Sequence, residues 1–194
     1  MDKTIITIAR EHGSGGREIG KCLAEMLGIP YYNKEIIAVT AEQSGLAEEF
    51  VRQVDTKGNS YSVFDLYTNT STPSIYTQAR IAQEKAIRYI ANQGSCIIIG
   101  RAAGYVLRDM PERTNVFIHA PIESRVERIV STYGDDPKSA EKEIRRSDKQ
   151  RSNFYSLMTG QKWNDYKLYD LVINSNLGIE GSAKVIAEYV RNKK

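Results

Sequence analysis

Four short runs of apolar and mostly β-branched residues mark the chain, and turn residues bound each of them. The runs cover residues 4–9, 96–99, 116–118 and 171–173. Short runs that are apolar at nearly every position, without alternation, are typical of strands buried on both faces of a parallel sheet. The pattern therefore predicts four central strands.

Between and after these runs, apolar residues recur at the spacing of an amphipathic helix. The helical patterns cover residues 19–27, 81–91, 122–130 and 179–190. Alternating strands and helices favour a three-layer α/β fold, in which helices cover both faces of a parallel sheet of about five strands. Such folds bind their ligands at the carboxyl ends of the strands.

Two segments fit this alternation poorly. Residues 57–73 are rich in Ser, Thr, Asn and Tyr, and residues 135–155 are strongly charged with little apolar periodicity. We expect both to be mobile insertions over the site rather than parts of the core. A chain of 194 residues is long enough for one α/β domain and short for two, so we expect a single domain.

Composition narrows the classes of function. The net charge of +3 is too small to indicate nucleic-acid binding by itself. Cys22 and Cys96 are the only cysteines and lie in apolar segments, so they predict neither a disulfide framework nor a metal site. The sequence shows no signal-peptide pattern and no apolar run of membrane-spanning length. We expect a cytoplasmic protein that binds neither a nucleic-acid polymer nor a membrane.

A glycine-rich segment follows the first predicted strand and opens the first predicted helix, within residues 9–20. The backbone N–H groups of such a turn and the positive end of the helix dipole form a phosphate site; the alternative is a tight turn without a ligand. Gly16 stands at the lysine position of the standard P-loop pattern and Arg17 at its Ser/Thr position. Arg17 could reach phosphate in place of that lysine, Arg10 could do so from the other side, and Ser14 offers the nearest hydroxyl for magnesium.

Several segments together resemble the cytidylate kinase-like family. Residues 8–20 (IAREHGSGGREIG) are similar to its divergent P-loop, and residues 27–33 (LGIPYYN) resemble the strand that opens its monophosphate-binding region. Residues 97–102 (IIIGRA) resemble the strand and GRD motif whose arginine contacts the acceptor phosphate. Residues 144–151 (IRRSDKQR) resemble the lid segment. These segments follow the family's order along nearly the whole chain.

The resemblance implies one P-loop kinase-like domain over residues 1–194, with an acceptor-binding insertion at about 32–80 and a lid at about 122–158. It implies ATP and Mg²⁺ as cofactors, held by Arg10, Gly13, Ser14, Gly15, Gly16, Arg17 and Glu18. It implies that the acceptor is bound by Tyr32, Asn33 and Arg101. Phosphoryl transfer would use Arg17, Arg101, Arg125, Arg146, Asp148 and Arg151. Ala102 replaces the Asp of the GRD motif, which weakens the case for cytosine recognition.

These assignments have alternatives. The lid arginines, Arg145 and Arg146 included, could form a solvated basic helix face, and Asp148 could simply pair with Arg151 three residues further on. We interpret His12 as a loop-shaping residue and Trp163 as a core residue that anchors the end of the lid.

The favoured function is transfer of the γ-phosphoryl group of ATP to a small acceptor, a nucleoside monophosphate such as CMP. A kinase for a non-nucleotide alcohol and a nucleotide-binding regulator without turnover are the alternatives, because a fold does not fix a function. The oligomeric state is left open.

Overall fold

The central element is a parallel sheet of five strands in the order β2-β3-β1-β4-β5. The computed structural model describes residues 3–49, 51–52 and 75–193. The strands are β1 (Ile5–Arg10), β2 (Tyr31–Tyr32), β3 (Cys96–Ile99), β4 (Arg113–His119) and β5 (Leu171–Asn174). β1 is central because its isoleucines are buried on both faces of the sheet, and it pairs with β3 and β4.

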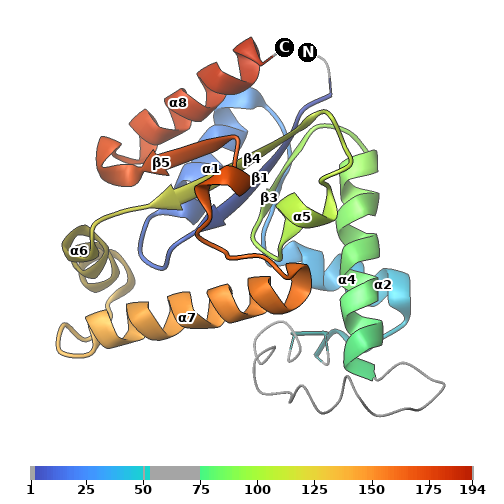
Figure 1. Cartoon of the computed structure of the whole chain (residues 1–194), viewed down its shortest axis with the longest axis horizontal. Helices are drawn as coiled ribbons and strands as arrows, with labels where there is room; N and C mark the ends of the chain where they lie inside the picture. Colours follow the sequence, from blue (N-terminus) through green and yellow to red (C-terminus); the bar gives the residue numbers. More distant parts are fainter. Residues whose placement is uncertain (1–2, 50, 53–74, 194) are drawn as a thin grey trace.

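Helices connect the strands. They are α1 (Gly16–Leu27), α2 (Glu35–Ser44), α4 (Ile75–Asn92), α5 (Ala103–Val106), α6 (Ile122–Tyr133), α7 (Ala140–Thr159) and α8 (Ile179–Asn192). Two single-turn 3₁₀ helices flank β5, at Tyr166–Leu168 and Ser175–Leu177. Figure 1 shows α1 and α8 on one side of the strands and α4 and α5 on the other.

The alternation of side chains along β1 sends its residues into two cores. Ile6 and Ile8 join residues of α1 and α8, whereas Ile5 joins residues of α4 and α5. The expected three-layer α/β fold with a parallel sheet is therefore confirmed. Among the helices of the described residues, none is long and apolar enough to cross a membrane.

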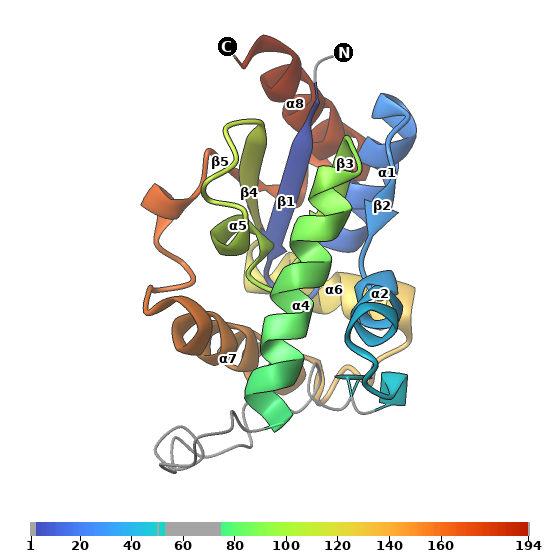
Figure 2. The ribbon, with the colours of Figure 1, turned by 90° about the vertical axis from the view of Figure 1, so that its right-hand side faces the viewer.

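The main correction concerns residues 135–155. This segment is not an insertion outside the core, since most of it forms α7, a helix of 20 residues. α7 lies across the carboxyl ends of the strands, as both orientations show (Figures 1 and 2). It buries Ala140, Ile144 and Tyr155. The other segment expected to be an insertion, residues 57–73, lies outside the described residues.

The packing of α7 gives a stability prediction. Ile144 is fully buried against Ile129 and Ala140, so Ile144→Ala should lower the free energy of unfolding by about 2–4 kcal/mol through lost burial and a residual cavity. Leu157 on the same helix is 45% exposed, and Leu157→Ala should change it by about 0.5 kcal/mol or less. Urea unfolding of both variants measures the difference. Equal small effects would show that α7 does not pack as described.

Candidate active site

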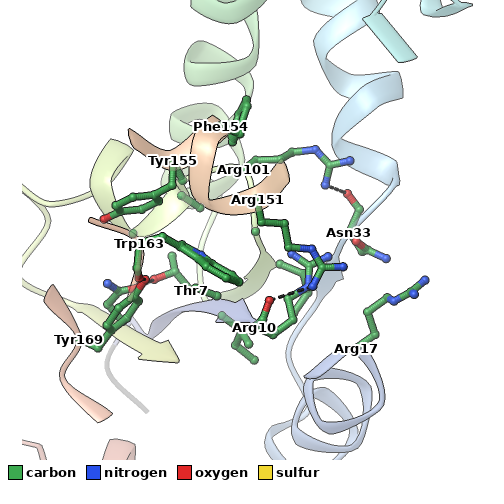
Figure 3. A pocket seen from close by; sticks show the side chains of 18 of the residues that line it. Thr7, Arg10, Arg17, Asn33, Arg101, Arg151, Phe154, Tyr155, Trp163 and Tyr169 are labelled. Carbon is green, nitrogen blue, oxygen red and sulfur yellow. Dashed lines mark hydrogen bonds between the residues drawn. The ribbon is translucent and has the colours of Figure 1, made fainter. Parts of the chain in front are cut away.

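A cavity of about 370 Å³ opens at the carboxyl ends of β1 and β3, under α7. The side chains that line it are basic at one end and aromatic at the other (Figure 3). At one end lie the basic side chains Arg10, Arg17, Lys34, Arg101 and Arg151 together with Asn33. At the other end lie Phe154, Tyr155, Trp163 and Tyr169, beside Thr7 and Asn115 from the sheet. We call these the basic end and the aromatic end of the cavity.

The turn after β3 is the most strained part of this site. Gly100, Arg101 and Ala102 have successive φ angles of 73°, 53° and 51°, all in the left-handed region. Only glycine adopts this conformation without penalty, so two such non-glycine residues in a row indicate a functional constraint. The turn directs the Arg101 side chain to the backbone carbonyl of Asn33, to which its Nη1 donates a hydrogen bond. The β3 turn and the segment after β2 are thereby joined at the basic end.

Arg10 is half-buried at the end of β1 and lines the cavity. Loss of solvent contact, and then the nearby positive charges of Arg151, Arg101 and Arg17, lower the pKa of Arg10 to about 9. Its Nε is buried and has no hydrogen-bond partner among the described residues. A partly desolvated cation that lies among other cations is unfavourable unless an anion joins it. The electrostatics of the basic end therefore favour a bound anion.

Two glycines make room for Arg10. A Cβ at Gly100 would lie 2.1 Å from Arg10 Nη1, and a Cβ at Gly16 would lie 2.6 Å from Arg10 Cβ. Both distances are far shorter than any real contact, so a larger residue at Gly100 would displace the guanidinium and one at Gly16 would displace the first carbons of the Arg10 side chain. Gly16 stands at the lysine position of the standard P-loop pattern. Its missing side chain leaves space for the aliphatic part of Arg10.

Arg151 fastens α7 to the turn between β1 and α1. Its Nη1 donates to the carbonyl of Arg10 at 2.9 Å, and its Nη2 lies 3.3 Å from His12 Nδ1. Burial, and then the charge of Arg151, lower the pKa of His12, so the ring is neutral at pH 7. Since arginine has only donors, Nδ1 accepts this hydrogen bond. His12 therefore shapes the loop, as the sequence suggests.

Asp148 makes the second connection between α7 and the loop. One carboxylate oxygen accepts the His12 backbone N–H at 2.7 Å, and the other accepts from Arg125 Nη1 at 2.5 Å. Arg125 also lies 3.6 Å from a carboxylate oxygen of Glu11, and its side chain is only 10% exposed. The expected alternative pairing of Asp148 with Arg151 is thus not the main one. Asp148 instead links a loop amide to a buried arginine.

The glycine loop has the backbone geometry that its sequence indicates. Gly13 and Gly15 have φ angles of 75° and 76°, and Gly15 is the N-cap of α1. Arg128 from α6 donates to the Gly13 carbonyl at 2.7 Å. Arg17 follows in the first turn of α1, lines the cavity, and lies over the ring of Tyr133 at 5.7 Å. The loop therefore sits between α6 and the basic end.

Two loop residues expected to bind the cofactor make other contacts. The Ser14 side chain is fully buried, and its hydroxyl donates to the Glu11 carbonyl at 2.9 Å. Glu18 accepts from the Tyr133 hydroxyl at 2.7 Å. Neither lines the cavity. Among the described residues, no group of three or more His, Cys, Asp or Glu side chains could hold a metal ion. Magnesium commonly takes most of its ligands from phosphate oxygens and water.

The expected acceptor and lid residues divide into two groups. Asn33, Arg101 and Arg151 line the cavity, whereas Tyr32 packs with the core around Ile5. Arg125 lies beside the loop but not in the cavity wall. Arg145 and Arg146 lie on the exposed side of α7 and pair with Glu141 and Glu143. The structure therefore does not bring Arg146 to the other candidates.

Sequence reasoning missed Lys34 and the aromatic end. Lys34 directly follows the predicted Asn33, so its position alone could have suggested it. Thr7 and Asn115 are polar residues inside buried strands and are register partners in the sheet, which is a usable signal. Trp163 is correctly assigned to the core, with 8% exposure, but it also lines the cavity.

The strand order, the glycine loop and the cluster of arginines at the strand ends define a protein of the P-loop kinase class. Residues 5–177 match the cytidylate kinase-like family. The chain belongs to that family, as its sequence motifs indicate.

Several known proteins are similar along most of their length. The cytidylate kinase of Pyrococcus horikoshii is 27% identical over 175 residues, which cover 90% of this chain and 81% of that protein. The cytidylate kinase of Methanococcoides burtonii is 30% identical over 173 residues, which cover 89% and 87%. An uncharacterized protein from Eubacterium ventriosum superposes with a TM-score of 0.75 at 27% identity, covering 98% of this chain and 100% of that one. Shikimate kinase from Bacteroides thetaiotaomicron gives 0.58 at 15% identity, covering 97% and 98%, a likeness of fold alone.

The contact between Gly100 and Arg10 can be tested with a matched pair of variants. Gly100 and Gly160 both have a φ near 70°, but an added Cβ meets Arg10 only at Gly100 and nothing within 4 Å at Gly160. Each alanine variant should lose about 1 kcal/mol of stability from the backbone conformation. Gly100→Ala alone should also lose most of the rise in melting temperature that inorganic pyrophosphate produces. Equal pyrophosphate effects in both variants would contradict the anion site.

Proposed function

We propose that the protein transfers the γ-phosphoryl group of ATP to a nucleoside monophosphate, with CMP as the leading candidate. One observation supports this most directly: four arginines, Arg10, Arg17, Arg101 and Arg151, line the cavity beside the glycine loop. Phosphoryl transfer needs mainly positioning and positive charge around the transferring group. The similarity to cytidylate kinases supports a nucleotide acceptor.

The donor phosphates belong, in this proposal, at the glycine loop. The positive end of α1, the left-handed Gly13 and Gly15 and the nearby Arg17 favour negative charge there. Bound ATP, with its magnesium, supplies the phosphoryl group and part of the charge neutralisation. Arg17, one residue after the lysine position of the standard P-loop pattern, contacts the donor phosphates in place of that lysine.

The acceptor's own phosphate belongs at the basic end, against Arg101 and Arg10. A neutral alcohol acceptor would leave the charge of Arg10, which lies among other arginines, without an anion on the acceptor side. A monophosphate acceptor provides that anion, which favours it over a non-nucleotide alcohol. Arg151 then lies between the two sites, since it contacts both the Arg10 carbonyl and the loop residue His12. α7 forms one wall of the cavity, through Arg151, Phe154 and Tyr155 among others, and in this proposal it helps to keep water from the reacting phosphoryl group.

An activity panel tests the proposal. Purified protein is incubated with ATP and Mg²⁺ and with CMP, dCMP, UMP, AMP or a simple alcohol, and nucleoside diphosphate and ADP are quantified together. Equal amounts of ADP and of one nucleoside diphosphate are expected. No transfer to any acceptor, combined with thermal stabilisation by ATP, would favour a nucleotide-binding regulator instead. Transfer only to an alcohol would favour the non-nucleotide kinase.

Two arginines of α7 provide a controlled comparison. Arg151→Gln should lower kcat by about 1000-fold, because an arginine that stabilises the transferring phosphoryl group contributes on that scale. Arg146→Gln should change kcat by about twofold or less, since Arg146 is 65% exposed and pairs with Glu143 on the surface. Steady-state kinetics of the two variants, with circular dichroism to verify folding, show which of the two arginines acts in phosphoryl transfer. A larger loss in the Arg146 variant would reverse the assignment.

A further inference from the structure

The cavity extends well beyond the arginines. At its aromatic end, Tyr155 and Tyr169 lie on the side away from Arg10, and Trp163 lies between them and the basic end (Figure 3). Phe154, from the same helix as Tyr155, lines the cavity from α7. A molecule whose phosphate is held at the basic end would therefore extend its remaining part toward Trp163.

The polar groups at the aromatic end are already used within the protein. The Thr7 hydroxyl donates to Asn115 Oδ1 at 2.8 Å, and Asn115 Nδ2 donates to the carbonyl of Leu168 at 2.7 Å. The Tyr169 hydroxyl donates to the carbonyl of Trp163 at 2.6 Å. A ligand that took over any of these donors would leave a buried acceptor without its partner, which is costly. The hydroxyl hydrogens of Thr7 and Tyr169 and one amide hydrogen of Asn115 are therefore not free to recognise acceptor atoms on the edge of a base.

The aromatic rings, in contrast, are held rigidly. Trp163 packs edge-to-face on Phe117, with ring centroids 5.2 Å apart and an interplanar angle of 77°. Tyr169 lies 5.0 Å from the same Phe117 ring. Rings fixed in this way can contact a planar ligand without losing further conformational entropy. The end of the cavity thus offers rigid aromatic surface, beside polar groups whose donor hydrogens are mostly engaged within the protein.

We infer that Trp163 is a specificity-determining residue, which recognises the acceptor's base by ring contact and shape and not by hydrogen bonds to its edge. This inference rests on the proposed function and names the acceptor class more closely: monophosphates with a planar ring, weakly distinguished by the ring's substituents. An amino group in place of a carbonyl on the ring then changes few contacts. CMP and UMP should differ by about tenfold or less in kcat/KM, since discrimination beyond about 100-fold requires hydrogen-bonding groups dedicated to one ligand.

Fluorescence provides a binding test that needs no turnover, because Trp163 is the only tryptophan in the chain. CMP and UMP should each change the emission of Trp163, with Kd values within about tenfold of each other. Ribose 5-phosphate, which has the phosphate and sugar but no base, should bind at least about tenfold more weakly and leave the emission nearly unchanged. An identical emission change with ribose 5-phosphate would overturn the ring contact. A CMP preference over UMP above about 100-fold would overturn recognition by shape.

Variants separate ring recognition from a structural role. Trp163→Leu should raise KM for CMP and for UMP by about tenfold each with little change in kcat, whereas Trp163→Phe, which keeps a ring, should restore most of the affinity. Tyr166→Leu is the control, since Tyr166 is 69% exposed and lies outside the cavity on the same connection. If Trp163→Leu fails to fold, Phe154→Leu at the half-buried neighbouring ring takes its place with the same expected KM increase. An unchanged KM in the folded variant would overturn the inference.

The two proposals fail in different ways. If CMP changes the emission of Trp163 but no acceptor is ever phosphorylated, the proposed function is wrong and the ring contact stands. If CMP is phosphorylated and UMP is not, the proposed function stands and recognition by shape is wrong.

Discussion

The repulsion among the arginines at the basic end is the constraint on which the site depends. Arg10 is half-buried at the end of the central strand, and loss of solvent contact, followed by its positive neighbours, lowers its pKa. Such an arrangement persists only when the surrounding structure fixes it, and Gly16 and Gly100 leave the space that the Arg10 side chain occupies. The left-handed turn at Arg101 adds a second guanidinium from β3. A bound anion reduces the repulsion among these arginines, so the arrangement favours the binding of an anion such as phosphate.

α7 connects this charge cluster to the glycine loop. Arg151 holds the Arg10 carbonyl and the His12 ring, while Asp148 holds the His12 amide and Arg125. The helix is therefore bound to the loop at adjacent points on one face, and it closes over the cavity from there.

Much of the fold and part of the site follow from the sequence. The buried β-branched runs predict the central strands, and the glycines predict the loop, because backbone requirements there leave few alternatives. α7 was harder to predict because only Ala140, Ile144 and Tyr155 of its 20 residues are buried, so its apolar period is weak. Sequence cannot separate Arg146 from Arg151 without the helix, in which five residues turn the side chain by about 140°. The aromatic end was missed because distant segments assemble it.

The central claim is that the basic end binds the phosphate of the acceptor. The most direct measurement is calorimetric titration of the wild-type protein with CMP and with cytidine, which differ only in that phosphate. Two or more charge-assisted hydrogen bonds from the arginines should make CMP bind at least about 100-fold more tightly than cytidine. Equal affinities for CMP and cytidine would contradict the claim, because the arginine cluster would then contribute nothing to acceptor binding.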